Sequence, residues 1–89
     1  MKVSLEYTQK ARQDLGEMDA MIREKIIIKL EFFCFQSSPT KQAKSLSGYF
    51  KGLHRFRVGD YRAIFKKDSK GNLLIITIVR IKHRKDVYE

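Results

Sequence analysis

Cysteine, proline and tryptophan are scarce in this chain, which has one Cys, one Pro and no Trp among 89 residues. The single cysteine, Cys34, excludes a disulfide within the chain and is typical of a reducing cytoplasm, where we expect to find the protein. Because Cys34 lies in the apolar run FFCF, we interpret it as a core thiol rather than a nucleophile.

Long hydrophobic stretches are also missing. No apolar run approaches the roughly 20 residues that a membrane span needs, and MKVSLEYTQK lacks the uninterrupted apolar stretch of a secretory signal. The two histidines, His54 and His83, are 29 positions apart and there is only one cysteine, so we expect no metal site and no cofactor. With 43% hydrophobic and 33% charged residues, residues 1–89 are expected to form one folded domain that has no contact with membranes.

Acidic residues are scarce in the second part of the chain. Residues 1–31 contain six Lys or Arg and six Asp or Glu, whereas residues 32–89 contain thirteen and four, so this part carries the whole net charge of +9. Such an asymmetry indicates a surface that binds a polyanion, nucleic acid first of all. The alternative is a basic surface that serves only solubility.

The first part of the chain predicts a strand followed by two helices. VSLEY (3–7) alternates apolar and polar residues as a strand does, and Thr8 is a plausible N-cap for a short helix over 9–15 that ends at Gly16. A longer helix is expected over 19–35. Its apolar residues recur at helical spacing: Met18, Ile22, Ile26, Leu30 and Phe33. Further apolar residues widen this stripe and predict a helix covered on more than one side: Met21, Ile27, Ile28 and Phe32.

The second part predicts a loop over 37–48 and then three strands. LHRFRV (53–58) and YRAIFK (61–66) read as a hairpin joined by Gly59-Asp60, in which Gly suits the first position of a type II′ turn. After a turn over 68–72, LLIITIVRI (73–81) reads as a long, central strand. The expected fold class is α+β, in the order β-α-α-β-β-β, with two helices packed on one face of a small, twisted, mostly antiparallel sheet.

The turn fixes the pairing of the hairpin and therefore the face that each side chain occupies. Val58 is expected opposite Tyr61, and Arg57 opposite Arg62. One face then belongs to the core: His54, Phe56, Val58, Tyr61, Ala63 and Phe65. The other face carries Leu53, Arg55, Arg57, Arg62, Ile64 and Lys66. Directly opposed arginines repel each other, and a bound phosphate would remove that cost. The alternative is that the two side chains point apart into water.

The last strand is expected to add cations to this face. If Val79 and Ile81 face the core, Arg80 and Lys82 lie beside Arg55, Arg57 and Arg62 in one concave basic face. The rim of that face would carry His83, Arg84 and Tyr88. Of these, His83 and Tyr88 are able to exchange protons. Since Leu74, Ile76 and Ile78 share the same parity, an apolar strip is expected beside the arginines, covered by a partner's amphipathic helix or by the chain's own C-terminus.

The ordered segments LEYTQKARQDL, MDAMIREKI, AKSLSGYFKGLHRFRVGDYR and HRKDVY resemble the RelE/ParE superfamily of toxins from bacterial and archaeal type II toxin–antitoxin pairs. The resemblance covers nearly the whole chain and implies two N-terminal helices on a twisted antiparallel sheet. Members similar to RelE cut mRNA in the ribosomal A site, whereas members similar to ParE poison DNA gyrase.

The resemblance to the RelE-like branch implies roles for individual residues. Arg55 and Arg62 match the catalytic positions of the hairpin, Lys82 or Arg84 the late basic position, and Tyr88 the terminal tyrosine. His83 is a second candidate for proton transfer. Four cations are expected to bind RNA: Lys44, Arg57, Arg80 and Lys82. Leu53 departs from the pattern, since some RelE proteins have a lysine there.

The implied reaction is attack of a ribose 2′-OH on the neighbouring phosphate with expulsion of the 5′-oxygen, which needs no metal and is confined to RNA. The implied partners are a cognate antitoxin, the ribosome and mRNA, with DNA contacted only indirectly through a toxin–antitoxin complex. Two alternatives remain: a ParE-like gyrase inhibitor without catalytic activity of its own, and a plain nucleic-acid-binding or inactive toxin-like domain.

Overall fold

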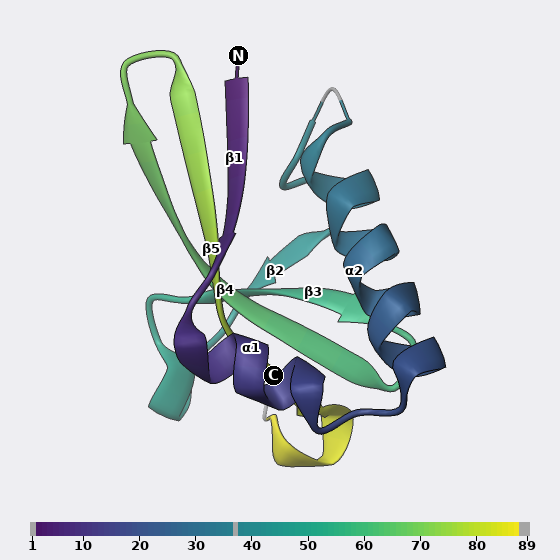
Figure 1. The fold of residues 1–89 in the computed structure, drawn as a ribbon. Helices are drawn as coiled ribbons and strands as arrows, with labels where there is room; N and C mark the ends of the chain where they lie inside the picture. The colour runs from purple at the N-terminus through teal and green to yellow at the C-terminus, as the bar shows by residue number, and fades with distance from the viewer. Residues whose placement is uncertain (1, 37, 88–89) are drawn as a thin grey trace.

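Two helices lie against one face of a five-stranded sheet (Figure 1). The computed structural model describes residues 2–36 and 38–87. Its elements in chain order are β1 (Lys2–Tyr7), α1 (Gln9–Gly16), α2 (Ala20–Cys34), β2 (Ala43–Ser45), the 3-10 helix η1 (Gly48–Phe50), β3 (His54–Val58), β4 (Tyr61–Lys70), β5 (Leu73–His83) and the 3-10 helix η2 (Arg84–Asp86). The spatial order β1-β5-β4-β3-β2 places β4 at the centre and β5 next to it.

The sheet is mixed, because β1 runs parallel to β5 while every other neighbouring pair is antiparallel. The predicted α+β class and the mostly antiparallel sheet are therefore confirmed. The segment expected as a loop over 37–48 contains the short strand β2, which was missed because Ala43–Ser45 has no alternating pattern. Strand β4 is also longer than expected, since it continues through residues 67–70, and the turn that follows is confined to Gly71 and Asn72.

The β3–β4 hairpin has the predicted register. Val58 pairs with Tyr61, and Arg57 pairs with Arg62. Gly59 has φ of +57°, the left-handed conformation that the first position of a type II′ turn requires and that other residues adopt only with strain. The two-residue loop thus fixes which side chains of β3 and β4 face the helices.

The main core lies between the helices and the sheet. Its buried residues are Ala11, Leu15, Ile26, Leu30, Phe33, Cys34, Phe56, Ala63, Phe65, Ile76, Ile78 and Ile81. Phe56 stacks on Phe65 with ring centroids 4.4 Å apart, and Phe33 of α2 stacks on Phe56 at 5.1 Å. Cys34 is completely buried, as expected for a core thiol, and burial raises its pKa to about 11.

A second, smaller apolar cluster lies on the other face of the sheet. Leu46, Ile64 and Val87 are buried in it, and Phe50, Leu53 and Val79 pack against them. An apolar strip was expected beside the arginines, but the residues that form it are not the predicted ones. Ile76 and Ile78 lie in the main core with Leu74 packed against it, and Val79 lies on the face opposite to the one predicted.

The cause of this correction is a break in the β4–β5 pairing. Phe65 pairs with Ile78 but Ile64 pairs with Arg80, so that Val79 has no direct partner and the two strands shift by one residue. Such a bulge reverses the alternation of side chains along the strand. The prediction depends on side chains that alternate between the two faces along the whole of β5, and at Val79 they do not.

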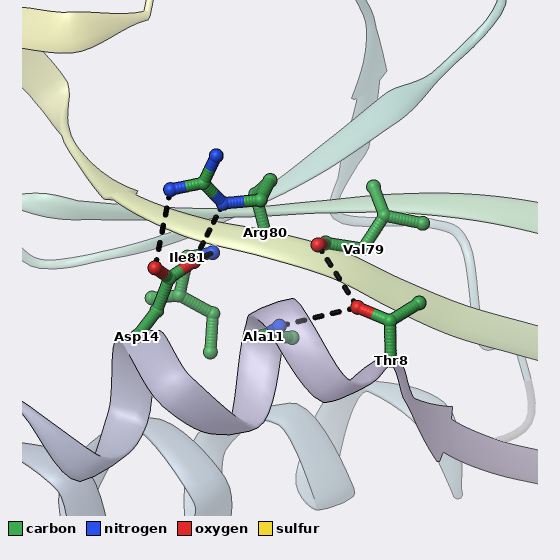
Figure 2. Close-up of polar contacts among 6 residues, drawn as sticks. All are labelled: Thr8, Ala11, Asp14, Val79, Arg80 and Ile81. Atoms are coloured by element: carbon green, nitrogen blue, oxygen red, sulfur yellow. Dashed lines mark hydrogen bonds and ion pairs between the residues drawn. The ribbon is translucent and has the colours of Figure 1, made fainter.

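Strand β5 continues beyond the end of β1, and α1 takes the place of β1 beside it. Thr8 makes the join: its backbone N–H donates to the Ile78 carbonyl, and its hydroxyl donates to the Val79 carbonyl at 3.0 Å. The same hydroxyl accepts a hydrogen bond from the Ala11 N–H at 3.1 Å, as predicted for an N-cap (Figure 2). A cap of this kind is typically worth about 1 kcal/mol.

Asp14, one helical turn further along α1, holds the end of β5. Its Oδ2 accepts hydrogen bonds of 2.9 Å from Arg80 Nε and from the Ile81 N–H, and its Oδ1 accepts one of 3.2 Å from Arg80 Nη2 (Figure 2). Burial acts to raise the pKa of Asp14, but the hydrogen bonds from Arg80 and Ile81 and the positive charges of Arg80 and Lys82 outweigh it, so the pKa is lowered. Arg80 pairs with Ile64, on the side of the sheet that was predicted, but its guanidinium group is bound to Asp14 of α1.

The outer face of α2 is exposed. Among the described residues the exposed large hydrophobic side chains are Met21, Ile28, Phe32 and Phe35. The expectation that this helix is covered on more than one side is therefore wrong for the chain by itself. Within residues 2–36 and 38–87, no helix combines the length and the hydrophobicity that crossing a bilayer requires.

The substitution Asp14→Asn is expected to lower the free energy of unfolding by about 1.5–3 kcal/mol near neutral pH, because it removes the charge that accepts these hydrogen bonds. The pKa of Asp14 is lower in the folded protein, so this stabilisation is fully present above the pKa of an unfolded aspartate, about 3.9, and is lost as the pH falls through the folded value. Urea unfolding of the two proteins over a pH series measures the difference.

The matched control is Asp68→Asn, which neutralises an exposed aspartate on β4 and is expected to change the free energy of unfolding by no more than about 0.5 kcal/mol. A difference between the wild type and Asp14→Asn that stays constant into strongly acidic solution would contradict the role given to Asp14.

Candidate nucleic-acid interface

Several cations lie on the face of the sheet that points away from the helices, and we give the name cationic face to the surface formed by five of them: Lys44, Arg55, Arg57, Arg62 and Lys82. Lys44 of β2 pairs directly with Arg55 of β3. Arg57 of β3 pairs with Arg62 of β4, which in turn pairs with Lys82 of β5. Directly paired residues point to the same side of a sheet, so Arg57, Arg62 and Lys82 form one row across three neighbouring strands.

Arg62, at the centre of this row, is only 6% exposed. Its Nη1 donates hydrogen bonds of 3.0 Å to the backbone carbonyls of Gly59 and Tyr61 at the hairpin turn. The turn therefore fixes the position of the guanidinium group. A fully charged group held in a partly desolvated place attracts an anion more strongly than one in water does.

Exposure differs across the cationic face. Arg55 is 9% exposed and lies beside the smaller apolar cluster, whereas Arg57 and Lys44 are exposed and Lys82 is half-buried. The cations of the predicted basic face therefore differ in how far a ligand can reach them. The two matched catalytic positions are buried, and the lysines and Arg57 are the groups that a large ligand reaches first.

The C-terminal segment returns to the hairpin turn. The Arg84 N–H donates to the Asp60 carbonyl at 2.8 Å, and Arg84 Nε lies 3.6 Å from Asp60 Oδ1. The side-chain pair is exposed and contributes little stability, but the backbone bond places Arg84 beside the end of the row. Val87 then packs against Ile64 and Leu46, so the smaller apolar cluster is covered in part by the chain's own C-terminal segment.

His83 points to the other side of the sheet. It pairs with Tyr61, whose ring it meets edge-on at 5.5 Å, and Tyr61 packs against the main core. Its Nδ1 accepts a hydrogen bond of 3.2 Å from the Lys85 N–H and so caps η2. The prediction that His83 lies at the rim of the basic face is therefore wrong, because alternation along β5 places it opposite to Lys82. Tyr88, the other predicted proton-transfer residue, lies outside the described residues.

His54 is on the helix side of the sheet, as its parity predicted. Its ring lies 5.5 Å from that of Phe65, and its Nδ1 is 3.3 Å from Ser45 Oγ. Burial first, and the charge of Lys67 second, lower the pKa of His54, so the ring is neutral near pH 7. It is a packing residue of β3 and has no contact with the cationic face.

Three residues that support this surface were missed in the sequence. Asp14 fixes the end of β5, Asp60 holds Arg84, and Val87 packs on Ile64. Only Asp14 could have been found from the sequence. It lies between the core residues Ala11 and Leu15 on a short helix, and an arginine interrupts the apolar strand 73–81, so an ion pair between the two elements could have been predicted. The other two depend on how the C-terminal segment turns back, which no local pattern shows.

Residues 5–88 match the family described as "ParE toxin of type II toxin-antitoxin system, parDE". The match spans nearly the whole chain, so the protein belongs to the ParE toxin family of the RelE/ParE superfamily. A search of the curated proteins found no match.

Solved structures of this superfamily share the fold. A chain of the RelBE2 toxin–antitoxin complex from Mycobacterium tuberculosis is 24% identical, with 94% of this chain and 100% of that chain covered and a TM-score of 0.72. A chain of the archaeal RelE–RelB complex from Pyrococcus horikoshii is 20% identical, with 98% and 100% covered and a TM-score of 0.68. A chain of the RelB–RelE complex from Methanococcus jannaschii is 28% identical, with 90% and 91% covered and a TM-score of 0.58.

The substitutions Arg62→Met and Arg57→Met are expected to differ in stability although the two residues are directly paired. Arg62→Met removes the donors to two turn carbonyls and should lower the free energy of unfolding by about 1.5–3 kcal/mol. Arg57→Met removes an exposed like charge and should change it by less than about 0.5 kcal/mol. Urea unfolding measures both, and equal losses would contradict the different settings of the two arginines.

Proposed function

We propose that this protein is the toxin of a type II toxin–antitoxin pair and that it cleaves mRNA on the ribosome. The observation that carries the proposal is the row Arg57–Arg62–Lys82, in which three cations are paired directly on adjacent strands on the side away from the helices. Like charges in direct opposition destabilise a sheet. A chain of phosphates along the row would neutralise them and place its backbone over the buried Arg62.

The chemistry follows from where the cations lie. Arg57, Lys44 and Lys82 reach the phosphates and hold the RNA in place. Arg55 and Arg62, both buried, stabilise the charge that builds on the phosphate as the 2′-OH attacks it and the 5′-oxygen leaves. Arg84, beside the end of the row, is placed for the leaving oxygen. In this step the 2′-OH loses a proton and the 5′-oxygen gains one, so a proton acceptor and a proton donor are also required.

Tyr88 is the proposed proton-transfer residue. His83 faces the other side of the sheet and uses Nδ1 to cap η2, so it is the weaker choice. Val87, the residue before Tyr88, packs against Ile64, which belongs to the same face as Arg62. Cations close to a phenol would make it lose its proton more readily than in water, as a group that must accept one requires.

The second candidate function is inhibition of DNA gyrase without chemistry of the chain's own. The matching family is described by the name ParE, and this observation favours it. A gyrase inhibitor needs a surface for a protein partner and no buried arginine for chemistry, so the burial of Arg55 and Arg62 is better explained by the first proposal. One set of assays distinguishes the two candidate functions.

A cognate antitoxin is the proposed partner, in line with the solved relatives, which are toxin–antitoxin complexes. A net charge of +9 and the cationic face suit an acidic antitoxin segment laid across Arg57 and Lys82, which would keep RNA away. Ribosome and mRNA are the proposed targets, which puts the protein in the cytoplasm, and DNA is contacted only through the complex.

Cell-free translation of a reporter mRNA tests the function, with cleavage mapped by primer extension. Cuts are expected within codons and only when ribosomes are present. Arg57→Ala and Lys82→Ala should each slow cleavage about tenfold to a hundredfold, because each removes from the row a cation that holds the phosphates. Tyr88→Phe should slow it at least as much by removing the exchangeable proton.

The matched control is Lys70→Ala, which removes an exposed lysine at the far end of the β4–β5 hairpin and should leave cleavage unchanged. Intact mRNA in the presence of active ribosomes would overturn the nuclease proposal. Loss of supercoiling by purified gyrase in a parallel assay would then establish the second candidate.

The affinity for the antitoxin is expected to depend strongly on salt. Its Kd, measured by titration calorimetry, should rise about tenfold or more between low and high ionic strength, because exposed charges are screened beyond a Debye length of about 8 Å at physiological salt. A Kd that does not change with salt would show that the antitoxin binds by apolar contacts and does not neutralise the cationic face.

A further inference from the structure

An apolar stripe runs along the side of α2 that faces away from the core. Met21 is 79% exposed, Ile28 is 65% exposed, and Phe32 and Phe35 are each 60% exposed. The buried residues of the same helix, Ile26, Leu30, Phe33 and Cys34, lie on the opposite side. In Figure 1, α2 runs along the outside of the molecule, with the sheet on one side of it only.

The stripe has the spacing of a coiled-coil seam. Positions 21, 25, 28, 32 and 35 alternate by four and three, which makes Met21, Ile28 and Phe35 d positions and makes Lys25 and Phe32 a positions of a heptad. The residues beside the seam differ in charge on its two sides. Glu24 and Glu31 occupy the g positions on one side, and Lys29 occupies an e position on the other.

This distribution of charge decides how two copies of α2 would pair. In an antiparallel pair, g faces g and e faces e, so Glu24 would meet glutamates and Lys29 would meet lysines. In a parallel pair, g of one helix faces e of the next heptad on the partner, so Glu24 meets Lys29 of the second copy, and the symmetry repeats the contact. Parallel pairing is therefore the arrangement in which the flanks of the seam attract each other.

We propose that two copies of this chain associate through the outer face of α2, as a parallel, two-fold symmetric helix pair. The seam is Met21, Ile28, Phe32 and Phe35. Lys25 sits at one a position, where a single polar residue sets the register and the number of strands at some cost in stability. This inference does not depend on the proposed function.

Two further features of the surface fit this occupant. A hollow of about 480 Å³ lies at the N-terminal half of the stripe, lined by Asp19, Met21, Ile22, Glu24, Lys25 and Ile28, so a side chain of a second helix has space to enter. The Lys29 ammonium group lies 5.4 Å from the centroid of the Phe32 ring. It is thus already held against the seam, on the side where Glu24 of the second copy arrives.

The strong positive charge of the chain does not oppose this pairing directly. The cationic face lies on the side of the sheet away from both helices, so in the pair the two cationic faces are directed outward. Residues 20–34 contain three cations, Arg23, Lys25 and Lys29, and two anions, Glu24 and Glu31, so charges of both signs lie along the contact itself. Both proposed RNA surfaces remain open in the dimer.

Analytical ultracentrifugation of the purified chain over a micromolar concentration series tests the proposal, and a monomer–dimer equilibrium is expected. Glu24→Lys and Lys29→Glu should each raise the dimer Kd roughly tenfold, since each places like charges together at two symmetric contacts. The double variant should restore the Kd of the wild type. Ile28→Glu should raise it about a hundredfold or more, because it puts two carboxylates in the seam.

The controls are Glu6→Lys on β1 and Lys10→Glu on α1, which change the net charge equally at exposed positions away from α2. Both should leave the Kd unchanged. All the substituted side chains are exposed, and thermal unfolding checks that each variant is folded. A chain that stays monomeric at every concentration overturns the proposal, as does a double variant that is as weak as the single ones. Loss of antitoxin binding by Ile28→Glu, with the wild type monomeric, would assign the stripe to that partner instead.

Discussion

The break in the β4–β5 pairing at Ile64 and Phe65 is the constraint on which the arrangement of side chains in this fold depends. Without it, Ile64 would pair with Val79 and Arg62 with Ile81, and the arginine at position 80 would point into the core beside Ala63. The one-residue shift lets β5 give its isoleucines to the core beneath the helices and still place Lys82 next to Arg62. Because of the bulge, the single strand β5 presents apolar side chains to the core and a lysine to the cationic face.

The cationic face combines groups that repel each other with a framework that does not let them separate. Arg62 is tied to the carbonyls of its own turn, and Asp14 fixes the backbone of β5 one residue before Lys82. Free cations on flexible stems would move apart and relieve the repulsion. Here Arg62 and the backbone of β5 are held in place, so a polyanion bound across the row would neutralise charges that the fold keeps close together. The proposed function rests on the position of these charges rather than on their number.

The sequence predicted the hairpin well and the ends of the sheet poorly, for one physical reason. The Gly59–Asp60 loop is local and allows one register, so Arg57 and Arg62 were correctly placed opposite each other. The bulge at Val79, in contrast, depends on contacts among strands that are distant in the chain, and the short strand 43–45 is paired with β3 rather than indicated by its own sequence pattern. For the candidate site, alternation predicted which residues share a face but not how deeply each is buried, since Val87 and its neighbours cover part of that face.

The parallel pairing of β1 with β5 has a consequence for how the protein is made. Val3 pairs with Leu74, and Tyr7 pairs with Ile78, so the first strand finds its partner only in the last one. While the chain is being synthesised, the helices have no complete sheet to pack on. Their apolar faces stay uncovered until the C-terminal strand has been made. Lys82 and Arg84 belong to the same late segment. A partly synthesised chain therefore lacks both its core and its cationic face, and any activity that needs this face arises only when synthesis of the chain is nearly complete.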